Sequence, residues 1–369
     1  MWLWIVVKYF LLKGPSMGKI RVIGVGGAGI NVAGFLNESL GGLARGRDIS
    51  TLEYLYLDTS KSNISRIDHD EDKFFLVSTK SLTKDLDGSG GERRTNAEYI
   101  KNNIPAFIDQ YRLVDRELSM YTIVVFSLSG GSGSVAGPLL VNELLTRNVP
   151  VMAIVVGDTR NQQSAINTKG SIVTLNNVAK KSRKVLPLVY FDNNIIDVED
   201  IEDGVDDELL VNGWVKSTVE TLMVLTGGGV GEIDQQDIVN FLQPGNYSKL
   251  NIPAGVYGVS VYKDTIPPAE SGSTSIPVMA RGMIPNGVTA PRLSPELNLL
   301  QYKRGLLAEH LSARINTAVY VVLMSNYLYD KNTFVESRLE IFDNLSKIRV
   351  AEIHGTGDHD DDDDGLLEF

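Results

Sequence analysis

Two glycine-rich segments, each placed between a short apolar run and a helical pattern, constrain the fold of this 369-residue chain. The first is Gly24–Gly29, which follows the β-prone run Lys19–Ile23. The second is Ser129–Ser134, which follows the apolar run Tyr121–Leu128. Small residues let backbone N–H groups approach phosphate oxygens closely, and a helix that starts there adds a favourable dipole. Two such loops at neighbouring strand ends predict a di- or triphosphate that is held from both sides.

The first loop by itself also fits a different ligand. Gly24, Gly26 and Gly29 match the GxGxxG pattern of dinucleotide-binding folds, and Asp58 ends the next predicted strand, where an acid would bind a ribose. The spacing from Gly29 to Asp58 is longer than the usual ~20 residues. An NAD(P)-binding oxidoreductase therefore remains an alternative, although a dinucleotide fold needs only the first loop.

Apolar runs alternate with helical patterns along the first half of the chain. Further strands are predicted at Thr51–Leu57, Phe74–Ser78, Val149–Val156 and Lys184–Phe191, and helices at Asn31–Leu40, Ala97–Leu118 and Val135–Leu145. This alternation predicts an α/β fold in which helices cover both faces of a mainly parallel, Rossmann-like sheet. The apolar spacing of Asp206–Thr226 predicts a long central helix.

The second half of the chain has a different character. Residues 235–335 contain β-rich runs and a Pro/Gly-rich stretch, which predict a smaller α/β C-terminal domain, and Ser337–Ile353 returns to helical spacing. The predicted organisation is an N-terminal segment 1–16, a nucleotide-binding domain 17–205, a central helix 206–226, a C-terminal domain 227–336, a C-terminal helix 337–354 and an acidic tail 355–369.

Charge and cysteine content exclude several classes of protein. The formal net charge is −11, but seven of the acidic residues lie after Gly357, so the body of the chain is only mildly acidic. No run of Lys and Arg marks a nucleic-acid surface, which argues against direct nucleic-acid binding. The absence of cysteine excludes disulfides and thiolate metal sites, and it fits a reducing cytoplasm.

The N-terminal run Met1–Leu12 is apolar apart from Lys8. It is too short to span a bilayer, and it lacks the basic start and cleavage site of a signal peptide. We interpret residues 1–16 as lying upstream of a true start at Met17. The alternative is a real extension that packs on the body of the protein.

The second glycine loop, taken with the first, resembles the nucleotide loops of the tubulin/FtsZ superfamily. The family signature is GGGTGTG or GGGTGSG, and this chain has SGGSGSV at 129–135, so that Ser129 and Val135 replace the outer glycines. The first loop and Asn31 also resemble their family counterparts, Asp58-Thr59 stands at the second family loop, and Gly88–Gly91 stands near the third. The nucleotide contacts that this resemblance implies are Gly26, Gly27, Ala28, Asn31, Asp58, Thr59, Gly90, Gly91, Ser129, Gly130, Gly131, Ser132, Gly133 and Ser134. Arg93 and Arg94 are either further phosphate contacts or solvated surface residues.

Two asparagines are the candidates for recognition of the base. An Asn amide offers both a donor and an acceptor, which suits the edge of guanine. Asn193 lies in a segment that resembles the tubulin Asp-Asn segment, and Asn212 matches the second base-contacting Asn of the family. The alternatives are an ordinary turn residue and a solvent-facing helix residue. Gly157–Gly170 departs from the Pro-containing ribose loop of bacterial FtsZ, and its Asp158, Thr159 and Arg160 are candidate ribose or phosphate neighbours.

Asp234 and Asp237 are the candidate catalytic residues. They are three residues apart at the start of a helical pattern, so both carboxylates lie on one helix face. The pair also has the pattern of a helix N-cap. The segment resembles the family loop that inserts into the pocket of the adjacent subunit, where a carboxylate positions the attacking water. Glu232 replaces the Asn of that loop, and its extra negative charge is expected to alter Mg²⁺ placement or the rate of hydrolysis.

The acidic tail is either a solubilising end or a contact segment. Its aspartates are followed by Leu366, Leu367 and Phe369, which are apolar anchors for a neighbouring subunit or another protein. Phage tubulins are thought to use such tails in filament contacts, and salt weakens contacts of this kind.

The resemblance implies a GTPase that binds GTP or GDP with Mg²⁺, forms a head-to-tail homopolymer in the bacterial cytoplasm and hydrolyses GTP at the interface between subunits. The departures from the family patterns, in Gly157–Gly170 and in the second glycine loop, look most like the divergent tubulins of large bacteriophages. The implied role of those proteins is a spindle that positions phage DNA in the host. Under this resemblance, residues 227–336 are an activation domain. The alternatives are a bacterial or plasmid division or partition tubulin, a non-hydrolysing scaffold and the NAD(P) oxidoreductase.

Overall fold

The computed structural model of the chain describes residues 18–43, 46–67, 69–77, 93–115, 121–194, 207–246, 251–266, 275–289 and 301–355. The predicted N-terminal segment 1–16, the predicted contacts Gly90 and Gly91, and the tail from residue 356 therefore lie outside the described residues.

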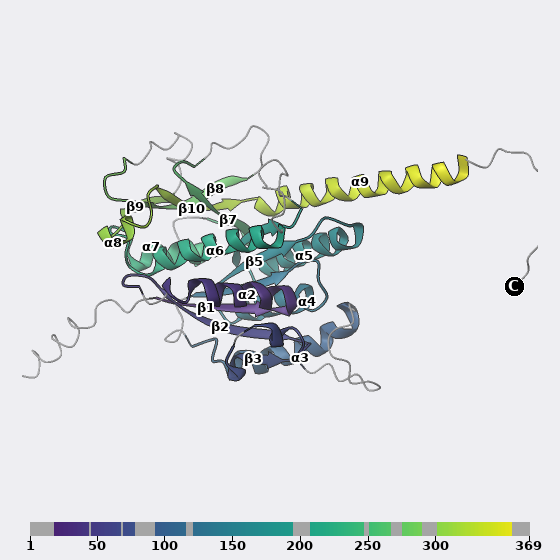
Figure 1. The fold of residues 1–369 in the computed structure, drawn as a ribbon, viewed down its shortest axis with the longest axis horizontal. Coiled ribbons are helices and arrows are strands. Elements are labelled where there is room, and N and C mark those ends of the chain that lie inside the picture. Colours follow the sequence, from purple (N-terminus) through teal and green to yellow (C-terminus); the bar gives the residue numbers. More distant parts are fainter. Residues whose placement is uncertain are drawn as a thin grey trace, which may run out of the picture.

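The described strands form one ten-stranded sheet in the order β3-β2-β1-β4-β5-β6-β7-β10-β8-β9 (Figure 1). The first six of them pair in parallel in the order 3-2-1-4-5-6. Their bounds are β1 Lys19–Val25, β2 Thr51–Asp58, β3 Phe74–Leu76, β4 Tyr121–Ser127, β5 Val151–Gly157 and β6 Val185–Asp192. This strand order is that of doubly wound nucleotide-binding folds, and it confirms the predicted Rossmann-like parallel sheet.

The C-terminal strands extend the same sheet. They are β7 Gly255–Lys263, β8 Ile276–Ile284, β9 Gln301–Leu306 and β10 Val319–Ser325. β7 pairs with β6 in parallel, β10 is antiparallel to both β7 and β8, and β9 is parallel to β8. The division of the chain into separate domains stays a prediction.

Helices cover both faces of the sheet because its strands carry apolar residues on both sides. One face carries α2 Gly26–Leu40, α6 Asp207–Thr226 and α7 Gln235–Leu242. The other face carries α3 Arg93–Gln110, α4 Gly133–Thr146, α5 Gln162–Lys181 and the start of α9 Tyr327–Gly355. A short α8, Glu309–Ser312, follows β9. The rest of α9 projects away from the body (Figure 1).

Three helices differ from the prediction. α3 ends at Gln110, before the predicted end at Leu118. α5 was not predicted, because its segment is polar and has Gly170 near its middle; only small or spaced residues such as Ala165 and Ile172 are buried. The Asn161 side chain caps this helix by accepting a hydrogen bond from the Ser164 N–H at 2.9 Å. α9 begins at Tyr327, well before the predicted start at Ser337, because its first turns pack into the core.

Helix α6 runs along the direction of the strands, from their carboxyl ends to their amino ends. Its last residue, Thr226, shares a 2.7 Å hydrogen bond with Ser50, which immediately precedes β2. Twenty residues of α-helix rise about 30 Å, so α6 links the carboxyl ends of the strands to their amino ends. None of the helices within the described ranges combines the length and apolar content that crossing a bilayer requires.

Candidate functional site

The two glycine loops meet at the carboxyl ends of β1 and β4. These strands are neighbours in the sheet, and the strand order reverses between them. Ligands of doubly wound sheets bind in the crevice at such a switch point. Both helices begin within the loops, α2 at Gly26 and α4 at Gly133, so two helix N-termini face the same crevice.

A cavity of about 480 Å³ lies between the two loops. Nine of its lining residues were predicted as nucleotide contacts: Gly26, Gly27, Ala28, Ser129, Gly130, Gly131, Ser132, Gly133 and Asn193. Most of the lining consists of small side chains and backbone, which suits the close approach of phosphate oxygens to N–H groups.

A second cavity, of about 310 Å³, adjoins the first and shares Gly27, Ala28 and Asn193 with it. Asn31 from α2 and Asn212 from α6 also line it, beside the buried Val211. The cavity therefore combines apolar walls with four asparagines, these three and Asn63, which is the composition expected around a planar, hydrogen-bonding base.

Asp58 and Thr59 lie behind this lining. Asp58 is buried and accepts hydrogen bonds from the Thr59 N–H at 2.7 Å and from the Asn63 side chain at 2.6 Å. Burial raises the pKa of the Asp58 carboxyl, and hydrogen bonds from Asn63, Thr59 and Ser132 offset only part of that effect. The Thr59 hydroxyl is 2.7 Å from that of Ser132, so these residues tie the end of β2 to the second glycine loop.

Sequence reasoning missed four residues of the first cavity's lining, Val25, Ser60, Asn63 and Ser127. Asn63 lines both cavities, and its amide nitrogen lies 2.9 Å from the position that a Cβ on Gly27 would occupy. No motif marks Asn63, because only the path of the chain after Asp58 brings it against the first loop.

Arg160 and Asp158, named from the sequence as candidate neighbours, do line the first cavity, between the two glycine loops. The Arg160 guanidinium donates to both Asp158 oxygens, at 3.1 and 2.9 Å. Burial opposes ionisation of Asp158, but these hydrogen bonds outweigh it and lower the pKa of the carboxyl. Thr159 is fully buried and donates its hydroxyl to Asp192 at 3.1 Å, so it acts behind the lining.

Ser134 faces away from the two cavities. Its hydroxyl donates to the Gly130 carbonyl, and the residue lines a groove of about 790 Å³ between α3, α4 and α5. The side chain therefore braces the second loop from behind.

Asp234 and Asp237 lie at the far end of α6 from these cavities. Asn212, near the start of α6, lines the second cavity, whereas α6 ends beside Ser50 and the acids follow it. The 14 residues from Asn212 to Thr226 rise about 20 Å. A subunit therefore does not bring these acids to its own glycine loops.

The two acids form the N-terminal cap of α7. The Asp234 carboxylate accepts from the Asp237 N–H at 2.8 Å, and Asp237 accepts from the Asp234 N–H at 3.2 Å, which is a capping box. Lys303 also pairs with the Asp237 carboxylate. Burial opposes ionisation of Asp237, but the contacts with Lys303 and the Asp234 N–H outweigh it, so its pKa is lowered.

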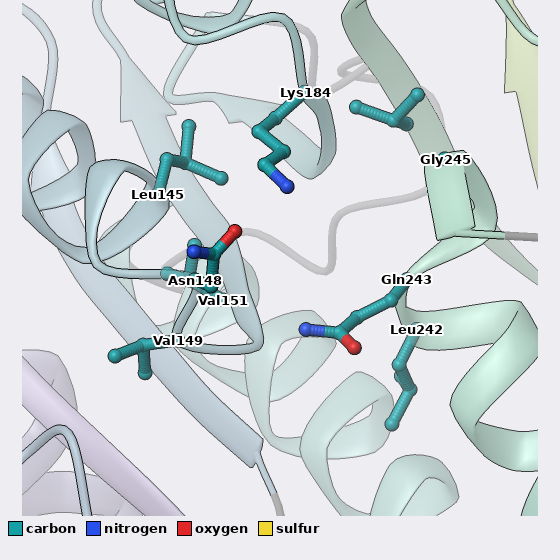
Figure 2. Close-up of a pocket in the computed structure, with 9 residues that line it drawn as sticks. Leu145, Asn148, Val149, Val151, Lys184, Leu242, Gln243 and Gly245 are labelled. Atoms are coloured by element: carbon teal, nitrogen blue, oxygen red, sulfur yellow. The ribbon is translucent and has the colours of Figure 1, made fainter.

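Two further features bear on ligands. Within the described part of the chain, no three His, Asp or Glu side chains are grouped to hold a metal ion. A small cavity of about 40 Å³ lies at the amino ends of β5 and β6, where Lys184, Asn148 and Gln243 surround it (Figure 2). It is too small for a nucleotide, because ligand pockets occupy about 300–1,000 Å³.

Comparison with known proteins agrees with this geometry. Residues 19–197 match the Tubulin/FtsZ family, GTPase domain. A phage tubulin-like protein of Pseudomonas phage phiKZ is 28% identical over 231 residues, which are 61% of this chain and 63% of the relative. The phage tubulin-like protein of Pseudomonas phage PhiPA3 is 26% identical over 198 residues, 53% of this chain and 55% of the relative. The match thus spans less than two thirds of the length of these relatives.

Similar solved structures share the fold. A protofilament of TubZ from bacteriophage PhiKZ has a TM-score of 0.66 at 21% identity and covers 94% of this chain and 95% of its own. The phage tubulin PhuZ with GDP has a TM-score of 0.67 at 19% identity, and the match covers 89% of this chain and 92% of that chain. Over residues 19–197, the chain therefore matches the GTPase domain of the tubulin/FtsZ family.

Proposed function

We propose that this protein binds GTP with Mg²⁺, assembles head to tail into filaments and hydrolyses GTP to GDP and phosphate at the interface between subunits. The observation that carries the proposal is the separation of the two halves of the site. The glycine loops lie at the carboxyl ends of the strands, and Asp234 and Asp237 lie beyond the opposite end of α6.

A head-to-tail contact brings the two halves together. When one end of a subunit meets the other end of the next, the contact is heterologous, and its repetition without closure makes a filament. Such a contact presents the α7 acids of one subunit to the glycine loops of its neighbour. A protofilament and a filament are among the solved structures that share this fold.

The nucleotide is proposed to lie across the two adjoining cavities. Its phosphates contact the backbone of Gly26–Ala28 and Ser129–Gly133, and its base lies against Asn193 and Asn212. Mg²⁺ keeps several waters and is bound largely through substrate phosphates in such sites. This fits a pocket whose described lining holds one carboxylate, Asp158, already paired with Arg160.

Hydrolysis then depends on Asp234 and Asp237 of the adjacent subunit, which orient the water that attacks the terminal phosphate. Asp234 is exposed and Asp237 is half-buried, and both stand at the N-terminus of α7. A lone subunit should hydrolyse GTP only slowly, because its pocket lacks these carboxylates.

The acidic tail is proposed to bind a neighbouring subunit of the filament. The groove between α3, α4 and α5 has an apolar floor that includes Pro138, Leu139 and Val178, and Lys101 and Lys181 line it as well. A segment with a run of aspartates followed by Leu366, Leu367 and Phe369 complements this groove in charge and hydrophobicity. At the cellular level, we propose a filament in the cytoplasm of a bacterial host that positions phage DNA without binding it directly.

The first test is light scattering by the purified chain after addition of GTP and Mg²⁺, with phosphate release measured in the same sample. Scattering that rises above a critical concentration and decays as GTP is consumed supports the proposal. A stable rise without phosphate release indicates a non-hydrolysing scaffold. No rise at any concentration contradicts assembly, and NAD(P) binding would then be measured.

A mixing experiment tests completion of the site between subunits. The double variant Asp234→Asn/Asp237→Asn keeps its pocket, and Gly26→Ala keeps its acids. Each should hydrolyse little GTP alone, whereas the mixture regains activity at contacts that join an intact pocket to intact acids. A mixture no more active than the sum of its parts counts against a shared site. Circular dichroism of each variant checks that it folds.

A further inference from the structure

Two cations on adjacent strands hold the start of α7. Arg281 on β8 and Lys303 on β9 are paired in register in the parallel ladder, so their side chains lie on one face of the sheet. Both contact Asp237. Arg281 donates to its main-chain carbonyl at 3.2 and 2.9 Å, and Lys303 pairs with its carboxylate.

The two cations differ in exposure. Arg281 is 3% exposed and also donates to the carbonyls of Ala280 and Gln301, so it anchors the α7 backbone. The Lys303 side chain is 47% exposed, whereas that of Asp237 is 15% exposed. Lys303 is therefore the more exposed partner of this ion pair.

Strand β9 also shapes the loop that leads to these acids. The Gly231 N–H donates to the Leu306 carbonyl at 2.8 Å, and Val230 forms a bridge with Leu307. At Gly305, an added Cβ would stand 1.7 Å from the Gly231 carbonyl oxygen, so only glycine permits this approach. The loop, the helix cap and Lys303 thus form one supported unit.

The contacts of Asp237 are directional. Both Lys303 and the Asp234 N–H bind its Oδ2 atom. This pins one oxygen of the carboxylate and leaves Oδ1 as the oxygen that these two contacts do not use. A carboxylate fixed in this way presents one defined oxygen to an incoming water, which is the geometric requirement for orienting a nucleophile.

We propose that Lys303 is a positioning residue for hydrolysis in the adjacent subunit: it holds Asp237 by Oδ2 beside Asp234, so that Oδ1 faces the attacking water. The inference rests on the proposed function. Lys303 itself need not contact the nucleotide. Its cation also moderates the repulsion between the phosphates and the three acids Glu232, Asp234 and Asp237.

The ionisation of Asp237 supports this role. Burial raises its pKa, but Lys303 and Arg281 from the sheet and the Asp234 N–H from its own helix end lower it more. A lowered pKa keeps the carboxylate ionised to lower pH. Loss of Lys303 should move the pKa back towards its ordinary value, so the acidic limb of the pH profile should shift to higher pH.

The test compares Lys303→Met and Lys303→Arg with the unaltered full-length chain. GTP hydrolysis is divided by the amount of sedimented polymer and measured across acidic and neutral pH. We expect Lys303→Met to lose about 10- to 100-fold in rate per polymerised subunit, because small misplacements at a reacting centre have effects of this size. Its acidic limb should move to higher pH, and Lys303→Arg should retain most of the rate. GTP binding to the unassembled subunit should not change.

The matched control is Arg304→Met. Arg304 is the next residue of β9, is exposed and points to the opposite face of the strand, so this variant removes the same charge without touching Asp237. It should hydrolyse GTP like the unaltered chain. If Lys303→Met does not assemble alone, it is copolymerised with an excess of unaltered protein, and the rate should fall with its fraction.

Lys303→Met polymer with the rate and acidic limb of the unaltered polymer would overturn the inference and leave the proposed function standing. A lower rate with an unmoved acidic limb, or without rescue by Lys303→Arg, would also overturn it, because that outcome indicates a general structural defect. If the unaltered chain assembles without hydrolysis, or does not assemble, the proposed function fails and the inference fails with it.

Discussion

The backbone of Gly133 lies against Gly26, so that a Cβ on Gly26 would stand 2.5 Å from the Gly133 nitrogen. Gly26 also has φ +70, a conformation that favours glycine. The two glycine loops, 107 positions apart in the chain by the difference of these two residue numbers, therefore form a single wall of the crevice. Neither loop can change shape without moving the other.

Gly26→Ala should disrupt both loops together. Strain at a positive φ costs on the order of 1–3 kcal/mol, and the clash with Gly133 displaces backbone that faces the phosphates. We expect at least about a 10-fold loss of GTP affinity, since 1.4 kcal/mol corresponds to a factor of ten. Titration of a fluorescent GTP analogue measures it. Gly42→Ala, where no atom lies within 4 Å of the new Cβ, should bind normally. Equal affinities would contradict this role of the contact.

Asp58→Asn should make stability less dependent on pH. The raised pKa of Asp58 means that its stabilising contribution is present below the unfolded-state pKa and is lost as pH rises through the folded-state pKa. Asn does not titrate, but it places a donor against the donors of Thr59 and Asn63, which costs about 1–3 kcal/mol. Urea unfolding should therefore show a larger deficit of the variant at about pH 4 than at about pH 7. A loss of unfolding free energy that increases with pH would contradict this prediction.

Asn212→Ala should weaken recognition of the base and leave the phosphate contacts intact. Asn212 lines the second cavity but does not line the first cavity, which lies between the two glycine loops. The loss of one hydrogen bond predicts roughly 10-fold weaker GTP binding and a smaller preference for GTP over ATP. Competition binding with both nucleotides measures this. Asn37→Ala, on α2 but outside both linings, serves as the control. An unchanged preference would remove Asn212 from base recognition.

Lys101→Glu/Lys181→Glu should raise the critical concentration for assembly. Both lysines line the groove between α3, α4 and α5 that we assign to the acidic tail. Deleting residues 356–369 should have a similar effect, and combining the deletion with the charge reversal should add little. Added salt should weaken assembly of the unaltered chain more than that of the deletion variant. Lys216→Glu, a charge reversal on α6 outside this groove, controls for net charge. Additive effects would indicate that the tail binds elsewhere.

Local sequence was sufficient to predict the parallel sheet and both glycine loops. Apolar strands followed at once by small residues and a helical pattern are properties of contiguous residues, and they do not depend on distant parts of the chain. For the same reason, most predicted residues of the two loops do line the cavities. Helix α5 was missed because its buried face is made of small and polar residues that carry little periodic signal.

Only the tertiary structure decided which distant residues meet. Asn63 reaches both cavities because the chain turns back after β2, and Lys303 reaches Asp237 because β9 pairs with β8 beside α7. The length of α6 separates the acids from the glycine loops, a relation that no motif contains. The sequence alone determined the chemical groups and their local loops, since these follow from neighbouring residues. Their assembly into a site depends on strand order and helix packing, which bring together residues far apart in the chain.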